Sequence, residues 1–134
     1  MVDFYRPDYL RKEKKTQDEK ALVRKTMEIY IEASRWLDYD KVISVVHPDA
    51  QLFIGNTSES KNLYKHWKQG LERFKDIDRE EYNKNTKIEI LLIEVEGTIA
   101  NVKLNYNSRY YDFHNLIKIN EEWKIVDKVS HEIE

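Results

Sequence analysis

The sequence predicts a single α+β domain in which helices cover one face of a curved antiparallel sheet. The first observation behind this is a change of period. Apolar residues recur at helical spacing up to residue 74 and at every second position after residue 86. The second is size, because 134 residues can bury a core without disulfides, and the chain contains no cysteine. The third is the shortness of the connections between the predicted strands, which favours hairpins.

The predicted first helix follows a charged segment. Residues 1–15 lack apolar periodicity, so we expect a tail or docking arm there and place the domain at residues 16–134. Thr16 and Glu19 have the spacing of a capping box and predict the start of the helix. One buried stripe then follows over about six turns. It comprises Val23, Met27, Tyr30, Ser34 and Leu37.

A short second helix and a short strand are expected next. Asp38 or Asp40 is a suitable N-cap for this helix. The helix has to end by His47, because Pro48 disfavours a helical residue before it. Residues 51–54 are then predicted to form a strand.

A third helix is predicted after Thr57 or Ser58, either of which can cap it. Its apolar stripe comprises Leu63, Tyr64, Trp67, Leu71 and Phe74. Residues 75–86 are polar, and we expect a loop there.

Four strands are predicted at 87–95, 98–106, 109–119 and 123–133, and their short connections make them an antiparallel meander. A two-residue turn after Tyr106 decides which side chains share a face. The buried face then comprises Ala100, Val102, Leu104, Tyr106, Tyr111, Phe113, Ile117 and Ile119, and the wetter face Asn101, Lys103, Asp112 and His114.

The last hairpin has two possible registers that differ in function. A three-residue loop pairs Ile119 with Trp123 and keeps the apolar residues of the last strand buried. A two-residue turn instead places His114 opposite Asp127 and moves every side chain of that strand to the other face. The three-residue loop is favoured because it buries more apolar side chains of the last strand. It brings two polar pairs into the apolar cup, namely Asn115 with Asp127 and Tyr111 with His131.

Three segments resemble a known family. Residues 113–119 are Phe-His-Asn-Leu-Ile-Lys-Ile, residues 123–129 are Trp-Lys-Ile-Val-Asp-Lys-Val, and residues 47–50 are His-Pro-Asp-Ala. Over residues 18–132 the chain is similar to the lumazine-binding, or SnoaL-like, branch of the nuclear transport factor 2-like superfamily. Asp127 departs from the family's usual Asn or His.

The resemblance implies a cone, in which the curved sheet wraps around a long N-terminal helix and a ligand pocket lies at the open end. It also implies a homodimer formed through the outer face of the sheet. Because fold does not determine function in this superfamily, the activity has to be argued from the pocket itself.

The leading hypothesis is an uncharacterised protein that binds a small organic molecule in a partly aromatic pocket. The residues expected to line the pocket are Tyr30, Trp36, Trp67, Tyr106, Tyr111, Asn115, Asp127 and His131. Aromatic residues at helical spacing more often belong to a plain core, so this is a hypothesis about the pocket rather than about a named ligand.

Two alternatives use other features. The resemblance implies that isomerases, cyclases and dehydratases share this fold, in which an Asp or His moves a proton beside a carbonyl. Here Asp127 would be the base, with Tyr111 or His131 polarising the oxygen, and a His114–Asp127 pair would serve in the other register. In the alternative without a catalytic role, Asp127 is a structural partner of Asn115 or of a lysine. A further alternative is a dimeric interaction module whose cone is filled by side chains.

Several function classes are disfavoured by composition. The net charge of −2 predicts neither nucleic acid nor a membrane surface as partner. The four histidines lack the spacing of metal ligands, and three scattered glycines do not make a phosphate-binding loop, so we expect no metal and no cofactor. Without a long apolar run, a cytoplasmic protein is expected.

Overall fold

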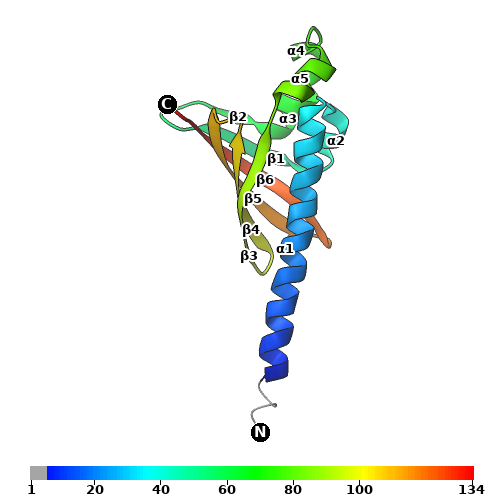
Figure 1. The fold of residues 1–134 in the computed structure, drawn as a ribbon, viewed down its shortest axis with the longest axis vertical. Helices are drawn as coiled ribbons and strands as arrows, with labels where there is room; N and C mark the ends of the chain where they lie inside the picture. Colours follow the sequence, from blue (N-terminus) through cyan, green and yellow to red (C-terminus); the bar gives the residue numbers. More distant parts are fainter. Residues whose placement is uncertain (1–5) are drawn as a thin grey trace.

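The computed structural model describes residues 6–134, whose helices precede a meander of four long strands as predicted (Figure 1). In chain order the elements are α1 Arg6–Arg35, α2 Tyr39–Ile43, β1 Val46–Ile54, β2 Ser60–Asn62, α3 Leu63–Lys68, α4 Gly70–Arg73, α5 Arg79–Asn85, β3 Ile88–Glu96, β4 Ile99–Tyr106, β5 Tyr110–Ile119 and β6 Glu122–Glu132. The four predicted strands agree with β3 to β6 to within one residue at every end. The order of elements places the helices first and the meander last, which confirms the α+β class.

Helix α1 buries the predicted stripe, but it begins earlier than expected. All five stripe residues are buried, whereas the helix starts at Arg6 rather than at Thr16. Thr16 does not cap: its hydroxyl donates to the carbonyl of Lys12 at 3.0 Å, one turn back within the same helix. The expected tail is therefore helical from residue 6 onward and passes beyond the sheet (Figure 1), while its residues 1–5 lie outside the described part.

The short helices are capped by acidic and amide side chains. Asp38 caps α2 as predicted, accepting from the Lys41 amide at 3.3 Å. Asn62, not Thr57 or Ser58, caps α3, and it accepts from the Lys65 amide at 2.8 Å.

The expectation of a loop over residues 75–86 is wrong, because α5 lies there. Asp78 accepts from the amides of Glu80 and Glu81 at 3.0 and 3.2 Å and caps this helix. None of its residues is fully buried, so no apolar periodicity announces it. The acidic cap followed by Glu81 was the available signal.

The sheet has six strands in the order β2-β1-β6-β5-β4-β3 and remains unclosed. The meander is antiparallel as predicted, but the sheet as a whole is mixed because β1 runs parallel to β6. This long-range pairing joins Leu52 to Lys128 and Ile54 to Ser130, and it brings β1 beside the strand that carries much of the candidate chemistry.

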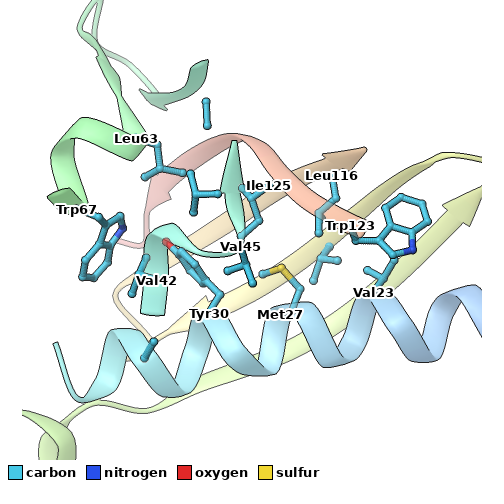
Figure 2. Packing of buried hydrophobic residues seen from close by; sticks show 14 of the residues in the cluster. Val23, Met27, Tyr30, Val42, Val45, Leu63, Trp67, Leu116, Trp123 and Ile125 are labelled. Atoms are coloured by element: carbon cyan, nitrogen blue, oxygen red, sulfur yellow. The ribbon is translucent and has the colours of Figure 1, made fainter. Parts of the chain in front are cut away.

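The core lies between α1 and the concave face of the sheet (Figure 2). Tyr30 and Trp67 lie toward one end of this core, and Val23 and Trp123 toward the other. Glu19 on α1 closes the second end: its carboxylate accepts from Lys118 Nζ at 2.7 Å and from Trp123 Nε1 at 2.8 Å. The hydrogen bond from Lys118 outweighs burial and lowers the pKa of Glu19. The helix is thereby fastened to the last hairpin.

Strand β5 presents the opposite face from the one predicted. The ladder pairs Tyr106 with Tyr110, not with Arg109, so the connecting loop holds one residue more than expected. The side chains of Asn105 and Asn107 hold this loop by accepting from the amides of Ser108 and Lys87. As a result Asp112 and His114 point into the molecule and are 2% and 0% exposed, and the neighbouring aromatic residues Tyr111 and Phe113 point outward.

Strand β6 combines the two registers that the sequence allowed. At the turn, Ile119 pairs with Glu122, as in a two-residue turn, which corrects the expected pairing with Trp123. The register then shifts by one residue between Ile125 and Asp127, which leaves Val126 as the extra residue of a β-bulge. Beyond the bulge the predicted pairs of Asn115 with Asp127 and of Tyr111 with His131 do form, but on the outer face, because Lys128 and Ser130 point inward.

Candidate functional site

A cavity of about 440 Å³ opens between the C-terminal half of α1, the sheet and the helices α3 and α5. Its wall is largely apolar and aromatic, with a small set of polar groups, which is the usual make-up of a small-molecule site. The lining residues are Tyr30, Ser34, Leu37, Leu52, Ile54, His66, Trp67, Phe74, Tyr82, Ile88, Leu104, Tyr106, Tyr110, Asp112, Lys128 and Ser130.

Two charged side chains meet on the sheet wall of the cavity. Lys128 Nζ lies 3.7 Å from Asp112 Oδ2, and the second carboxylate oxygen, Oδ1, is buried without a hydrogen-bond partner among the described residues. Burial alone would lower the pKa of Lys128, but the neighbouring oxygens of Tyr30 and Asp112 outweigh it and the pKa is raised. Lys128 therefore stays protonated inside the cavity.

Behind the cavity wall lies a histidine that no hydrogen bond satisfies within the described chain. Both ring nitrogens of His114 are buried without a partner, and the ring packs edge-on against Tyr30 with centroids 5.2 Å apart. Burial, and secondarily the charge of Lys128, hold the pKa of His114 well below its ordinary value, so the ring is neutral at pH 7. The hydroxyl of Tyr30, which lines the cavity, is also buried without a partner in this part of the chain.

The opposite wall is made by side chains from the helices. Tyr82 on α5 and Tyr106 on β4 share a hydrogen bond between their hydroxyls, and burial together with this bond raises the pKa of Tyr106. On α3, a ring nitrogen of His66 contacts the guanidinium of Arg73. Burial, followed by the charges of Arg73, Lys128 and Lys61, lowers the pKa of His66 to about 4. Both groups are thus neutral hydrogen-bonding side chains at pH 7.

The predicted pocket residues divide between two faces. Tyr30, Trp67 and Tyr106 lie in the cavity wall. Trp36 is 39% exposed on α1, where its indole donates to Glu32 at 3.0 Å, and it does not line the cavity. His114 is buried behind Tyr30 rather than on a wet outer face.

The four polar residues predicted from β5 and β6 lie outside the cavity. Asn115 donates to Asp127 at 2.9 Å and accepts from Asn101 at 2.9 Å, which makes a polar ladder across three strands. Tyr111 pairs with His131 on the same outer face, and Lys103 Nζ lies 4.8 Å from the Tyr111 ring centroid. Asp127 therefore has Asn115 as its partner, which is the arrangement that the non-catalytic alternative describes.

Sequence reasoning missed the polar groups that do line the cavity: His66, Tyr82, Asp112, Lys128 and Ser130. Each strand residue among them is one position away from a predicted one. A signal for Asp112 was its strict alternation with His114 and Leu116, which share its face. Nothing local announces the bulge that turns Lys128 inward.

Comparison with known proteins places the fold and the family. The model of the family described as "Putative lumazine-binding" matches residues 18–131, which is most of the chain. The chain belongs to this family. None of the curated proteins matches it. Membership agrees with the resemblance seen in the last two strands.

Solved structures of the nuclear transport factor 2-like fold are similar throughout their length. A protein of unknown function from Shewanella baltica is 18% identical with a TM-score of 0.65, covering 88% of this chain and 95% of its own. One from Novosphingobium aromaticivorans, with a cystatin-like fold, is 8% identical with a TM-score of 0.70, covering 93% and 88%. A ketosteroid isomerase-like protein from Erwinia carotovora atroseptica is 14% identical with a TM-score of 0.60, covering 87% and 97%. At these identities the likeness establishes the cone fold alone.

Residues 6–134 lack two features. No helix there is long and apolar enough to cross a membrane. In the same range, no group of three or more histidine, aspartate or glutamate side chains is arranged to hold a metal ion.

Proposed function

We propose that this protein binds a small, planar organic molecule in the cavity beside α3. The observation that carries the proposal is the combination of free volume and unpartnered polar atoms. The cavity of about 440 Å³ lies within the range of ligand sites, and two of its lining residues, Tyr30 and Asp112, each carry a buried oxygen without a hydrogen-bond partner among the described residues. Buried polar groups rarely lack partners, so these two atoms are suited to receive a ligand.

The aromatic wall supports a flat ligand. The ring of Trp67 packs against Tyr30 and Tyr39 with centroids 6.3 and 6.1 Å apart, and Tyr39 is stacked with Phe74. Rigid aromatic walls of this kind bury a planar molecule at little cost in side-chain entropy. The name of the family points to lumazine, which is a planar heterocycle, and so to the same class of ligand.

The interaction-module alternative has less support, because it requires a cone filled by side chains. The enzymatic alternative loses Asp127, which lies on the outer face, and would have to use Asp112. Since Asp112 is already paired with Lys128, a role in binding accounts for it more directly than a role as free base.

A thermal-shift screen with two neighbouring variants tests the proposal. Ile54 lines the cavity, and Phe53 beside it on β1 is 46% exposed on the other face. A planar heterocycle or hydrophobic acid at a hundredfold excess over its Kd should stabilise the wild type by about 2.7 kcal/mol. Ile54→Trp should abolish this stabilisation by filling the cavity, and Phe53→Trp should keep it. Equal stabilisation of both variants, or no stabilising compound in a broad screen, would contradict the proposal.

We also propose that a second copy of the chain covers the outer face of the sheet, as the family resemblance implies. A row of directly paired residues lies there: Leu92, Lys103, Phe113, Val129 and Phe53. Its four apolar members are 39–48% exposed, and three of them, Phe113, Val129 and Phe53, are directly adjacent, while Lys103 separates Leu92 from Phe113. Contiguous apolar surface of this kind typically marks a protein contact.

Light scattering after size exclusion tests the dimer. We expect a dimeric mass for the wild type and a monomeric mass for Phe113→Asp, because a carboxylate in the middle of the row would have to lose its hydration when the two copies meet. Ile77→Asp is the matched control, since Ile77 is 39% exposed but lies between α4 and α5. A monomeric wild type, or a dimer that survives Phe113→Asp, would exclude this face as the interface.

A further inference from the structure

We propose that the cavity selects a negatively charged ligand, a planar organic acid whose carboxylate is held at Lys128. This inference rests on the proposed binding function and adds the charge of the ligand to it. Three features carry it: the hydrogen-bond donors in the lining, the cations that gather beside it and a single lining carboxylate that is already paired.

Donors outnumber fixed acceptors on the polar part of the wall. Lys128 can only donate, and the hydroxyls of Tyr30 and Ser130 each carry a proton. In the hydrogen bond between Tyr82 and Tyr106, one hydroxyl donates and the proton of the other stays free. A ligand with acceptor atoms satisfies the ammonium group and the free hydroxyl protons together.

His66 is a neutral member of the wall that is held by Arg73. A guanidinium cannot accept, so the ring nitrogen of His66 that contacts Arg73 has to accept from it. The ring is neutral at pH 7, because its pKa is lowered to about 4. Its proton therefore sits on Nε2, which lies 3.4 Å from the same guanidinium nitrogen, so the ring adds no positive charge and no free donor to the wall.

The charges around His66 have one sign. After burial, the causes of its low pKa are Arg73, Lys128 and Lys61, and all three are cations. Lys61 is the Cα partner of Leu52, which lines the cavity, and Leu52 is in turn the partner of Lys128. These cations therefore gather at one side of the cavity, where they attract an anion.

Among the described residues that line the cavity, Asp112 is the only carboxylate. It lies 3.7 Å from Lys128, so it offsets part of one positive charge and leaves those of Arg73 and Lys61 uncompensated at this side. A ligand carboxylate near Lys128 would meet an ammonium group that is still able to form hydrogen bonds, on a side chain that is 18% exposed.

The test uses three probes with one aromatic body: 2-naphthoate, 2-naphthamide and 2-naphthylmethylamine, titrated calorimetrically at pH 7. We expect 2-naphthoate to bind about tenfold more tightly than the amide, because charge-assisted hydrogen bonds are the stronger ones. The cationic amine should bind most weakly. Lys128→Met should reduce the affinity for 2-naphthoate to that for the amide and leave the amide unchanged.

Two further variants keep the result interpretable. Asp112→Asn with Lys128→Met removes both charges, so it avoids an unpaired carboxylate if the single variant folds poorly, and it should also lose the preference for the acid. Lys103→Met on the outer face should keep it. Equal affinity for acid and amide, or tighter binding of the amine, would overturn the anion inference while leaving the binding function standing. If none of the three probes nor any compound of the screen binds, the proposed function itself fails.

Discussion

The free energy of unfolding should fall as the pH is lowered from 6.5 toward 4, because two histidines are neutral in the folded protein. The pKa of His66 is lowered to about 4 and that of His114 lies well below the ordinary 6.5, in both cases mainly through burial. In this window the unfolded chain takes up protons that the folded protein does not. Each histidine then removes about 1.4 kcal/mol of stability per pH unit. Above pH 6.5 this stability is fully present.

Urea unfolding between pH 5 and 8 measures this slope, and His114→Leu separates the two histidines. The variant should reduce the slope by the contribution of one histidine. It should also raise the stability at pH 7 by about 1 kcal/mol, because it removes two buried nitrogens without partners. His131→Gln, an exposed change on the outer face, is the control and should keep the wild-type slope. A stability that is flat between pH 7 and 5 would show that neither ring is buried as described.

Replacing Asp112 with leucine should destabilise the fold by about 3 kcal/mol, because it leaves the ammonium group of Lys128 without its partner in a largely apolar wall. The expected loss is at the low end for buried pairs, since Lys128 is 18% exposed and can turn toward the opening. Chemical denaturation at pH 7 measures the difference in the free energy of unfolding.

The double variant Asp112→Leu with Lys128→Met distinguishes a structural pair from one kept for binding. Replacing both members of a buried pair with apolar residues is often neutral or stabilising, so most of the lost stability should return. We expect the double variant to fold well and to have lost its preference for the acidic probe. If Asp112→Leu alone were as stable as the wild type, the pair would not be desolvated in the folded protein.

The prediction from sequence agrees best with the structure where buried positions repeat at helical spacing over many turns. The stripe from Val23 to Leu37 is buried at every predicted position because a helix of this length shows its period several times over. The aromatic residues Tyr30 and Trp67 belong to such stripes, and both line the cavity. The α5 helix was missed because it buries nothing fully, so only its cap distinguishes it from a loop.

The predicted site residues were placed on the wrong face of the sheet because of two extra residues, one in a loop and one in a strand. Arg109 lengthens the loop before β5, and Val126 forms the bulge in β6. Because side chains alternate between faces, each insertion moves a whole strand segment to the other side of the sheet. Asp112 and Lys128 thereby take the places in the cavity that had been assigned to Tyr111 and Asp127.

By itself the sequence determined the α+β class, the order of the long elements, the buried stripe of α1 and the family. These depend on periodicity and on local motifs, which any stretch of chain carries within itself. Only the tertiary structure decided which polar side chains enter the cavity. That choice depends on contacts between distant segments, such as the parallel pairing of Leu52 with Lys128 and the bonds from Glu19 to the last hairpin. A shift of one residue changes little in local propensity, and those distant contacts select one register over the other.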